Sequence, residues 1–220
     1  EIMADPEPSQ GLPITEYLEI FNASDELINL GEVVLSDATG NTPLPAGIIL
    51  PGEYLALTPT SSVELFADNI KVIGVSGWLS LNNGGEKLAL NVGANEIFSV
   101  IYSDDWYNDP LFDGGRSLEM VDVSNFCGEE NNWTAASEDV GGTPGAANSV
   151  TASNPDLRGP QLLNAFAINA QSIELIFDEK LILDGDEVQF STSPELTLEN
   201  FTIINERGSK ARITSATNIE

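Results

Sequence analysis

Acidic side chains are concentrated in one short stretch, SDDWYNDPLFDGG, which spans residues 103–115. Hard cations such as Ca²⁺ take carboxylate and amide oxygens from irregular loops of this kind. The spacing is not the Asp-x-Asp-x-Asp-Gly spacing of an EF-hand loop, so a solvated acidic loop at the edge of a sheet is the competing interpretation. If the loop binds Ca²⁺, the candidate ligands are Asp104, Asp105, Asp109 and Asp113.

Two aromatic residues, Trp106 and Tyr107, lie in the middle of the same stretch. An exposed aromatic side chain can stack on a sugar ring or anchor a protein partner. The same two side chains could instead fill a hydrophobic core. We therefore treat them as a candidate binding site for a protein or polysaccharide surface, and the structure decides whether they are exposed.

A second set of carboxylates lies near the start of the chain and comprises Glu1, Asp5, Glu16 and Glu19. Glu16 and Glu19 point to opposite faces of a predicted strand, so they cannot both belong to one site. Pairs of carboxylates also catalyse glycoside hydrolysis, but the sequence shows no pocket that would hold a sugar. We expect these carboxylates to be structural.

The overall composition excludes several classes of function. The 220 residues include 35 acidic and 8 basic ones, which gives a net charge of −27 at pH 7. Such a surface repels nucleic acid and anionic membranes. The chain has no histidine and one cysteine, Cys127, which excludes imidazole catalysis and most zinc sites. No run of about 18 apolar residues is present, so no membrane insertion is expected. We predict a protein that is not an enzyme.

Short β-like runs separated by Gly, Pro, Asn and Asp recur along the first 150 residues. Alternation of apolar and polar residues is clear in TEYLEIFN (15–22), where Leu18 and Ile20 share one face. The pattern predicts an all-β sandwich. A hairpin is predicted at Asn82-Asn83-Gly84-Gly85. The other predicted strands cover 32–37, 47–58, 69–75, 78–92, 96–103 and 116–122.

The polar stretch SVTASNPDLRG (149–159) is typical of a linker, and the β pattern restarts after it. We predict three parts: a sandwich over 1–149, a linker over 150–159 and a second β domain over 160–220. About 65 residues are few for a sandwich of roughly 100, so the second domain is expected to be incomplete. Its predicted strands cover 161–169, 172–181, 187–192, 201–205 and 211–220, with an Asp-Gly turn at 184–186.

A series of short motifs in the first 150 residues resembles the lamin tail domain in its bacterial secreted form. The matching pieces are EIMADP (1–6), EYLEIFNAS (16–24), INLGEVVLSD (28–37), LPAGIILPGEYLAL (44–57), LSLNNGGEKLAL (79–90), FSVIYSDDW (98–106), GGRSLE (114–119), NW (132–133) and GGTPGAAN (141–148). The resemblance implies an immunoglobulin-like sandwich, with GGTPGAAN as its closing motif. Leu30-Gly31-Glu32 lacks the aromatic residue usual in the family, and Phe98 stands where an acidic residue is common.

The second β domain is similar, mainly through SIELIFDEKL (172–181), to bacterial Ig-like surface modules of the S-layer type. Together the resemblances imply a non-catalytic adhesion or structural module of a bacterial surface or secreted protein, located outside the cell after removal of an export signal. Its partners would include neighbouring domains of the same polypeptide. The alternative is an accessory domain of a secreted hydrolase or nuclease whose catalytic domain lies elsewhere. No cofactor other than Ca²⁺ is expected.

Overall fold

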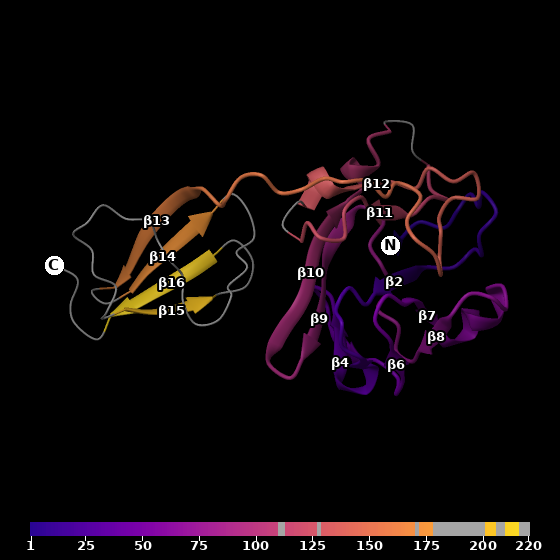
Figure 1. The fold of residues 1–220 in the computed structure, drawn as a ribbon, viewed down its shortest axis with the longest axis horizontal. Helices are drawn as coiled ribbons and strands as arrows, with labels where there is room; N and C mark the ends of the chain where they lie inside the picture. The colour runs from indigo at the N-terminus through magenta and orange to yellow at the C-terminus, as the bar shows by residue number, and fades with distance from the viewer. Residues whose placement is uncertain (110–112, 127–128, 170–171, 178–200, 206–209, 216–220) are drawn as a thin grey trace. The chain divides into compact units, whose positions relative to one another are not determined.

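The computed structural model describes residues 1–109, 113–126, 129–169, 172–177, 201–205 and 210–215. The chain divides into two compact units, Glu1–Pro155 and Asp156–Glu220. Strands and short 3₁₀ helices make up the regular structure of the first unit, the described elements of the second unit are strands, and the fold is all-β (Figure 1). Cys127 lies outside the described residues.

Two sheets carry most of the first unit (Figure 1). The six-stranded sheet has the order β12-β11-β1-β2-β7-β8, with β7 and β8 parallel. The four-stranded sheet has the order β10-β9-β4-β5. The first sheet contains β1 (Ile2–Met3), β2 (Tyr17–Phe21), β7 (Tyr54–Pro59), β8 (Val72–Val75), β11 (Leu118–Met120) and β12 (Trp133–Ala135). The second contains β4 (Val33–Ser36), β5 (Asn41–Pro43), β9 (Gly85–Val92) and β10 (Asn95–Ser103).

Smaller elements connect these strands. The strands β3 (Ile28–Asn29) and β6 (Ile48–Ile49) pair with each other. The 3₁₀ helices are η1 (Leu30–Glu32), η2 (Thr60–Leu65), η3 (Asp104–Tyr107) and η4 (Glu129–Asn132). None of the helices in the described part of the chain has the length and apolar character needed to cross a membrane.

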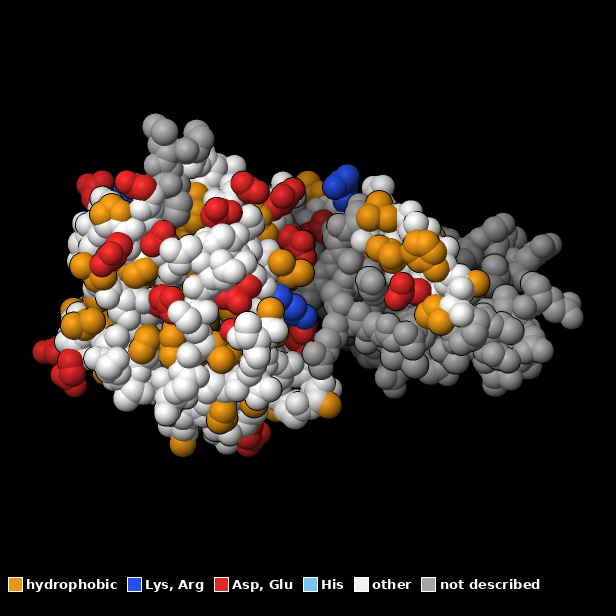
Figure 2. Space-filling model, turned by 180° about the vertical axis from the view of Figure 1, so that it is seen from behind, with side chains coloured by type: hydrophobic (Ala, Val, Ile, Leu, Met, Phe, Trp, Pro, Cys, Tyr) orange, Lys and Arg blue, Asp and Glu red, His pale blue; other side chains and the backbone are white. Residues whose placement is uncertain are grey.

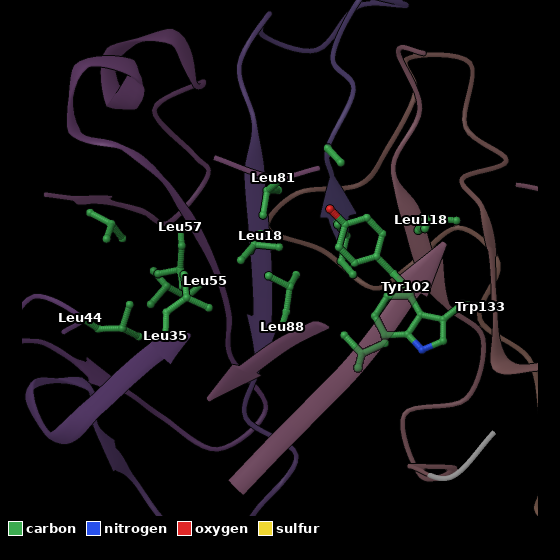
Figure 3. Close-up of a cluster of buried hydrophobic side chains, with 14 of the residues drawn as sticks. Leu18, Leu35, Leu44, Leu55, Leu57, Leu81, Leu88, Tyr102, Leu118 and Trp133 are labelled. Carbon is green, nitrogen blue, oxygen red and sulfur yellow. The ribbon is translucent and has the colours of Figure 1, made fainter. Parts of the chain in front are cut away.

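The main hydrophobic core is built by side chains from both sheets (Figure 3). Leu18, Leu57 and Leu118 come from the six-stranded sheet, and Leu35 and Leu88 come from the four-stranded one. Each fully buried leucine contributes about 1.5–3 kcal/mol relative to an exposed one. The predicted placement of Leu18 and Ile20 on one face is confirmed, because both pack in this core.

The opposite face of the six-stranded sheet is also covered. Met3 and Tyr17 are buried there against Phe66, and the rings of Tyr17 and Phe66 meet edge to face with centroids 5.7 Å apart. The strand β2 is therefore buried on both sides. A carboxylate carried on this second face lies inside the protein, which bears directly on the role of Glu19.

The predicted hairpin at 82–85 is wrong. The hairpin of the four-stranded sheet joins β9 to β10 about ten residues later, across Gly93 and Ala94. Residues 78–84 form no strand in the structure, and the carboxylate of Glu16 contacts the first part of this stretch. Glu16 accepts hydrogen bonds from the Trp78 indole N–H at 2.6 Å and from the Leu81 backbone N–H at 3.2 Å.

The second unit contributes one described sheet, with the order β13-β14-β16-β15. The strands are β13 (Leu162–Asn169), β14 (Ser172–Phe177), β15 (Phe201–Asn205) and β16 (Lys210–Ser215). All neighbouring pairs in this sheet are antiparallel. The predicted strand at 187–192 and the predicted turn at 184–186 lie outside the described residues.

Candidate functional site

Residues 141–150, which we call the closing segment, lie against a group of buried carboxylates. Glu1, Glu19 and Glu119 come from β1, β2 and β11 or the residue adjoining them, and they are 7%, 8% and 0% exposed. Each of the three accepts a hydrogen bond from the closing segment. The segment is therefore attached to three neighbouring strands of the six-stranded sheet and is not a free linker.

Glu1 is the best hydrogen-bonded of the three carboxylates. Its Oε1 accepts hydrogen bonds from the Tyr17 hydroxyl and, at 2.7 Å, from the Ser117 hydroxyl. The backbone N–H of Thr143 donates to Oε1 at 3.1 Å. Burial, followed by the charge of Glu1, raises the pKa of Tyr17 well above its usual value, so the phenol remains a donor.

Glu119 is fully buried and joins β11 to both ends of the closing segment. Its Oε1 accepts the Thr143 hydroxyl at 2.7 Å, and its Oε2 accepts the Ser149 hydroxyl at 2.7 Å and the Val150 N–H at 3.2 Å. Hydrogen bonds to a charged acceptor contribute about 1.5–3 kcal/mol each. Glu119 therefore anchors the segment at two places, Thr143 and Ser149–Val150.

Glu19 is less well satisfied. Its Oε2 accepts the Gly145 N–H, whereas its Oε1 is buried and has no hydrogen-bond partner. Desolvation by burial raises the pKa of Glu19 from 4.5 to about 7. Near neutral pH this carboxyl group exists in both protonation states, in contact with a segment that is docked mainly by hydrogen bonds.

Gly142 shows how closely the closing segment approaches the carboxylates. A Cβ atom at this position would lie 2.7 Å from the Ser117 Oγ and 2.7 Å from the Tyr17 hydroxyl oxygen, and would overlap Glu1 Oε1. Real Cβ atoms essentially never approach so closely. A side chain at residue 142 therefore cannot be accommodated unless the Glu1, Ser117 and Tyr17 side chains or the segment itself move.

We expect Gly142→Ala to lower the free energy of unfolding by about 2 kcal/mol, the usual cost of overpacking a closely packed site. Urea unfolding followed by tryptophan fluorescence measures this value. Gly40→Ala is the matched control, because its Cβ would make only an ordinary contact at 3.7 Å with Leu79. An equal cost for both substitutions would contradict close docking of the segment.

The predicted separation of Glu16 from Glu19 is found in the structure. Glu16 holds Trp78, Ser80 and Leu81, whereas Glu19 contacts the closing segment. Glu119, Ser117 and Thr143 were not predicted from the sequence as site residues. The only sequence feature that could have indicated a buried carboxylate is the position of Glu119 between Leu118 and Met120, in a strand that is otherwise apolar.

The predicted calcium ligands do not come together among the described residues. Asp104 and Asp105 form the first turn of η3, where the Asp105 N–H is capped by the Ser103 hydroxyl at 3.2 Å. Asp109 and Asp113 flank residues 110–112, which lie outside the described part. Within that part, no three acidic or cysteine side chains are arranged to hold a metal ion. The calcium site stays a prediction, which melting temperatures in EDTA and in CaCl₂ would test.

The hypothesis that Trp106 and Tyr107 bind a partner required both side chains to be exposed, but the structure buries them. They are 8% and 5% exposed and belong to the main core. The Trp106 ring packs beside Trp133, with centroids 6.4 Å apart. The η3 helix turns both aromatic side chains inward while its aspartates begin the helix, so the two residues serve packing.

The site therefore combines three buried carboxylates with a segment that supplies their hydrogen-bond donors. Comparison of the chain with protein-family models, with curated proteins and with solved structures found no match.

Proposed function

We propose that the protein is a non-catalytic binding or structural module of an exported bacterial protein, with a lamin-tail-like immunoglobulin sandwich as its first unit. The main support for this proposal is the hydrogen bonding of the buried carboxylates. The carboxylate oxygens of Glu1 and Glu119 accept hydrogen bonds from the protein's own closing segment. Such carboxylates hold a fold together, whereas a catalytic pair must face a substrate.

The closing segment supports the family resemblance as well. A closing role for GGTPGAAN is consistent with the hydrogen bonds that Thr143 and Gly145 of this segment donate to Glu1 and Glu19 of the six-stranded sheet. Gly145 has φ +87°, the left-handed conformation that glycine adopts readily. This turn directs its N–H to Glu19.

A binding role is favoured by the edge of the four-stranded sheet. The strand β10 is nine residues long and pairs with β9 at one end of the described sheet order. Ile97 and Ile101 on this strand are 51% and 59% exposed. A long edge strand with exposed aliphatic side chains is a surface to which a protein partner can add. The acidic surface seen in Figure 2 favours partners without strong negative charge.

The purified protein is expected to release no product from plasmid DNA, p-nitrophenyl phosphate or p-nitrophenyl glycosides above the buffer rate. Glu1→Gln and Glu19→Gln are assayed in parallel, with Glu64→Gln as an exposed control. Turnover that both cluster variants abolish and the control retains would overturn the proposal, because it would show that the buried carboxylates are catalytic.

The accessory-domain alternative predicts different adjoining domains in the full-length gene product. A structural or adhesion module would be accompanied by further Ig-like repeats, whereas an accessory domain would be joined to a hydrolase or nuclease domain. Sequencing the complete gene and mapping the mature polypeptide by mass spectrometry decides between them.

A further inference from the structure

The turn that precedes β9 contains the only Asn-Gly pair in the chain, Asn83-Gly84. In such a pair the backbone nitrogen of the glycine can attack the side-chain carbonyl carbon of the asparagine, because glycine has no Cβ atom to hinder the approach. Both residues are exposed to solvent. Within the described part of the chain the Asn83 amide group has no hydrogen-bond partner that would keep it from reacting.

The backbone around this pair is held by a network centred on Asn82. The Gly85 N–H donates to the Asn82 carbonyl at 2.9 Å, which closes a four-residue β-turn. The Gly84 N–H donates to Asn82 Oδ1 at 3.0 Å. Asn82 itself is fixed, because its N–H donates to Glu86 Oε1 at 2.8 Å and its carbonyl accepts the Tyr102 hydroxyl at 2.7 Å. The glycine nitrogen is therefore restrained while the turn is closed.

The two glycines of this turn differ in what the fold requires of them. Gly85 has φ +108°, and a Cβ atom there would lie 2.2 Å from the Tyr102 carbonyl oxygen. The close approach of β9 and β10 therefore needs glycine at residue 85. A Cβ atom at Gly84 would make only an ordinary contact, at 3.6 Å with Asn82 Oδ1. Alanine fits at residue 84, so its introduction tests the chemistry of the pair without disturbing the fold.

We propose that Asn83 is a site of slow spontaneous deamidation, and that the side chain of Asn82 sets its rate by holding Gly84 in the closed turn. In the reaction the Gly84 nitrogen loses its proton and forms a bond to Asn83 Cγ. The bond from Cγ to the side-chain nitrogen breaks, and that nitrogen leaves with the proton as ammonia. Water then opens the resulting cyclic imide at either of its two carbonyl carbons. The inference goes beyond the proposed function and does not depend on it.

The two products of ring opening are aspartate and isoaspartate, and both disturb the turn. Each adds a carboxylate to a turn that already holds the carboxylate of Glu86, and like charges at short range repel each other. In isoaspartate the main chain passes through the former side chain. This adds a carbon atom to the ring that the Gly85 N–H and the Asn82 carbonyl close. We therefore expect the converted protein to open this turn more readily and to expose the Gly85 amide.

The experiment incubates the full chain at mildly alkaline pH and follows Asn83 by peptide mapping with mass spectrometry. Isoaspartyl methyltransferase labels the isoaspartate product. A synthetic peptide with the sequence of residues 79–88 gives the rate in the absence of the fold. Gly84→Ala hinders the attack, and Asn82→Ala removes the acceptor of the Gly84 N–H but keeps the backbone hydrogen bonds of the turn. Gly142→Ala, which lies outside the turn, is the control for global stability.

Asn83 is expected to convert more slowly in the folded protein than in the peptide. Asn82→Ala is expected to raise the rate severalfold toward that of the peptide, and Gly84→Ala to lower it at least tenfold. Gly142→Ala is expected to leave the rate unchanged, because the reaction requires opening of the turn and not of the whole unit. The converted protein, separated by anion exchange, is expected to show faster hydrogen exchange at the Gly85 amide.

Three results would overturn the proposal. The first is an intact Asn83 after many half-lives of the peptide. The second is a rate that Asn82→Ala does not change, because the turn would then not be what restrains the glycine nitrogen. The third is a rate that Gly142→Ala raises as much as Asn82→Ala does, because the reaction would then proceed from the unfolded chain.

Discussion

Replacing Glu119 by alanine is expected to lower the free energy of unfolding of the first unit by about 3–5 kcal/mol, the range for breaking a buried charged network. The side chain is 0% exposed and accepts three hydrogen bonds from the closing segment. Alanine leaves the hydroxyls of Thr143 and Ser149 and the N–H of Val150 without this acceptor. It also opens a cavity next to Leu118. Urea unfolding measures the loss.

Two further variants assign the loss to the network. Glu119→Gln keeps the size of the side chain and one acceptor oxygen, but places an amide donor against hydroxyl or N–H donors, so we expect an intermediate loss. Glu64→Ala removes an exposed carboxylate of η2 and is expected to change stability by less than about 0.5 kcal/mol. A loss for Glu119→Ala as small as that for Glu64→Ala would show that the closing segment is held by other contacts.

The sequence predicted the strands of the first unit where apolar alternation was strong. Leu18 and Ile20 identified the core face of β2, whereas the pairing of β2 with β7 was found only in the structure. The hairpin at 82–85 failed because Asn and Gly favour a turn without requiring a paired strand on each side of it. A distant carboxylate, Glu16, decided the conformation of residues 78–81. Local pattern cannot reveal a contact across more than 60 residues.

The candidate site was harder to predict for a related reason. Parity assigned Glu19 to the face opposite Leu18, and an exposed position is the usual outcome for a carboxylate on such a face. The structure buries it because the closing segment covers that face. The prediction for Trp106 and Tyr107 was wrong in the opposite direction, because side chains expected at the surface are buried. Aspartates beside them suggested a solvated loop, but a single 3₁₀ turn places charged and aromatic side chains on different sides.

Glu19→Gln is expected to make the first unit more stable than the unchanged protein at pH 8 and equally stable at pH 4. Burial raises the pKa of Glu19 from 4.5 to about 7 in the folded state. Between these values the folded protein keeps a proton that the unfolded chain has released, so its stability falls as the pH rises. Each pH unit in this window costs about 1.4 kcal/mol, which gives about 3 kcal/mol in total above pH 7. Glutamine does not ionise and avoids this loss.

The other ionisable groups that face Glu19 decide in which pH range its titration can be measured. They are the carboxylates of Glu1 and Glu119, the α-amino group of Glu1, and the Tyr17 and Tyr54 hydroxyls. Burial raises the pKa values of both tyrosines, so neither loses its proton between pH 4.5 and 7.

The half-buried Asp37 and Asp122 have lowered pKa values. Backbone and side-chain hydrogen bonds outweigh desolvation at Asp37, and backbone hydrogen bonds dominate at Asp122. Their contribution to stability is lost as the pH falls below the usual aspartate range, which opposes the effect of Glu19 in sign. Both proteins carry the same aspartates, so the contributions of Asp37 and Asp122 cancel when the stability of Glu19→Gln is compared with that of the unchanged protein. Urea midpoints at half-unit steps from pH 4 to pH 8 should therefore diverge between pH 4.5 and 7. Parallel curves would show that Glu19 titrates at its ordinary pKa.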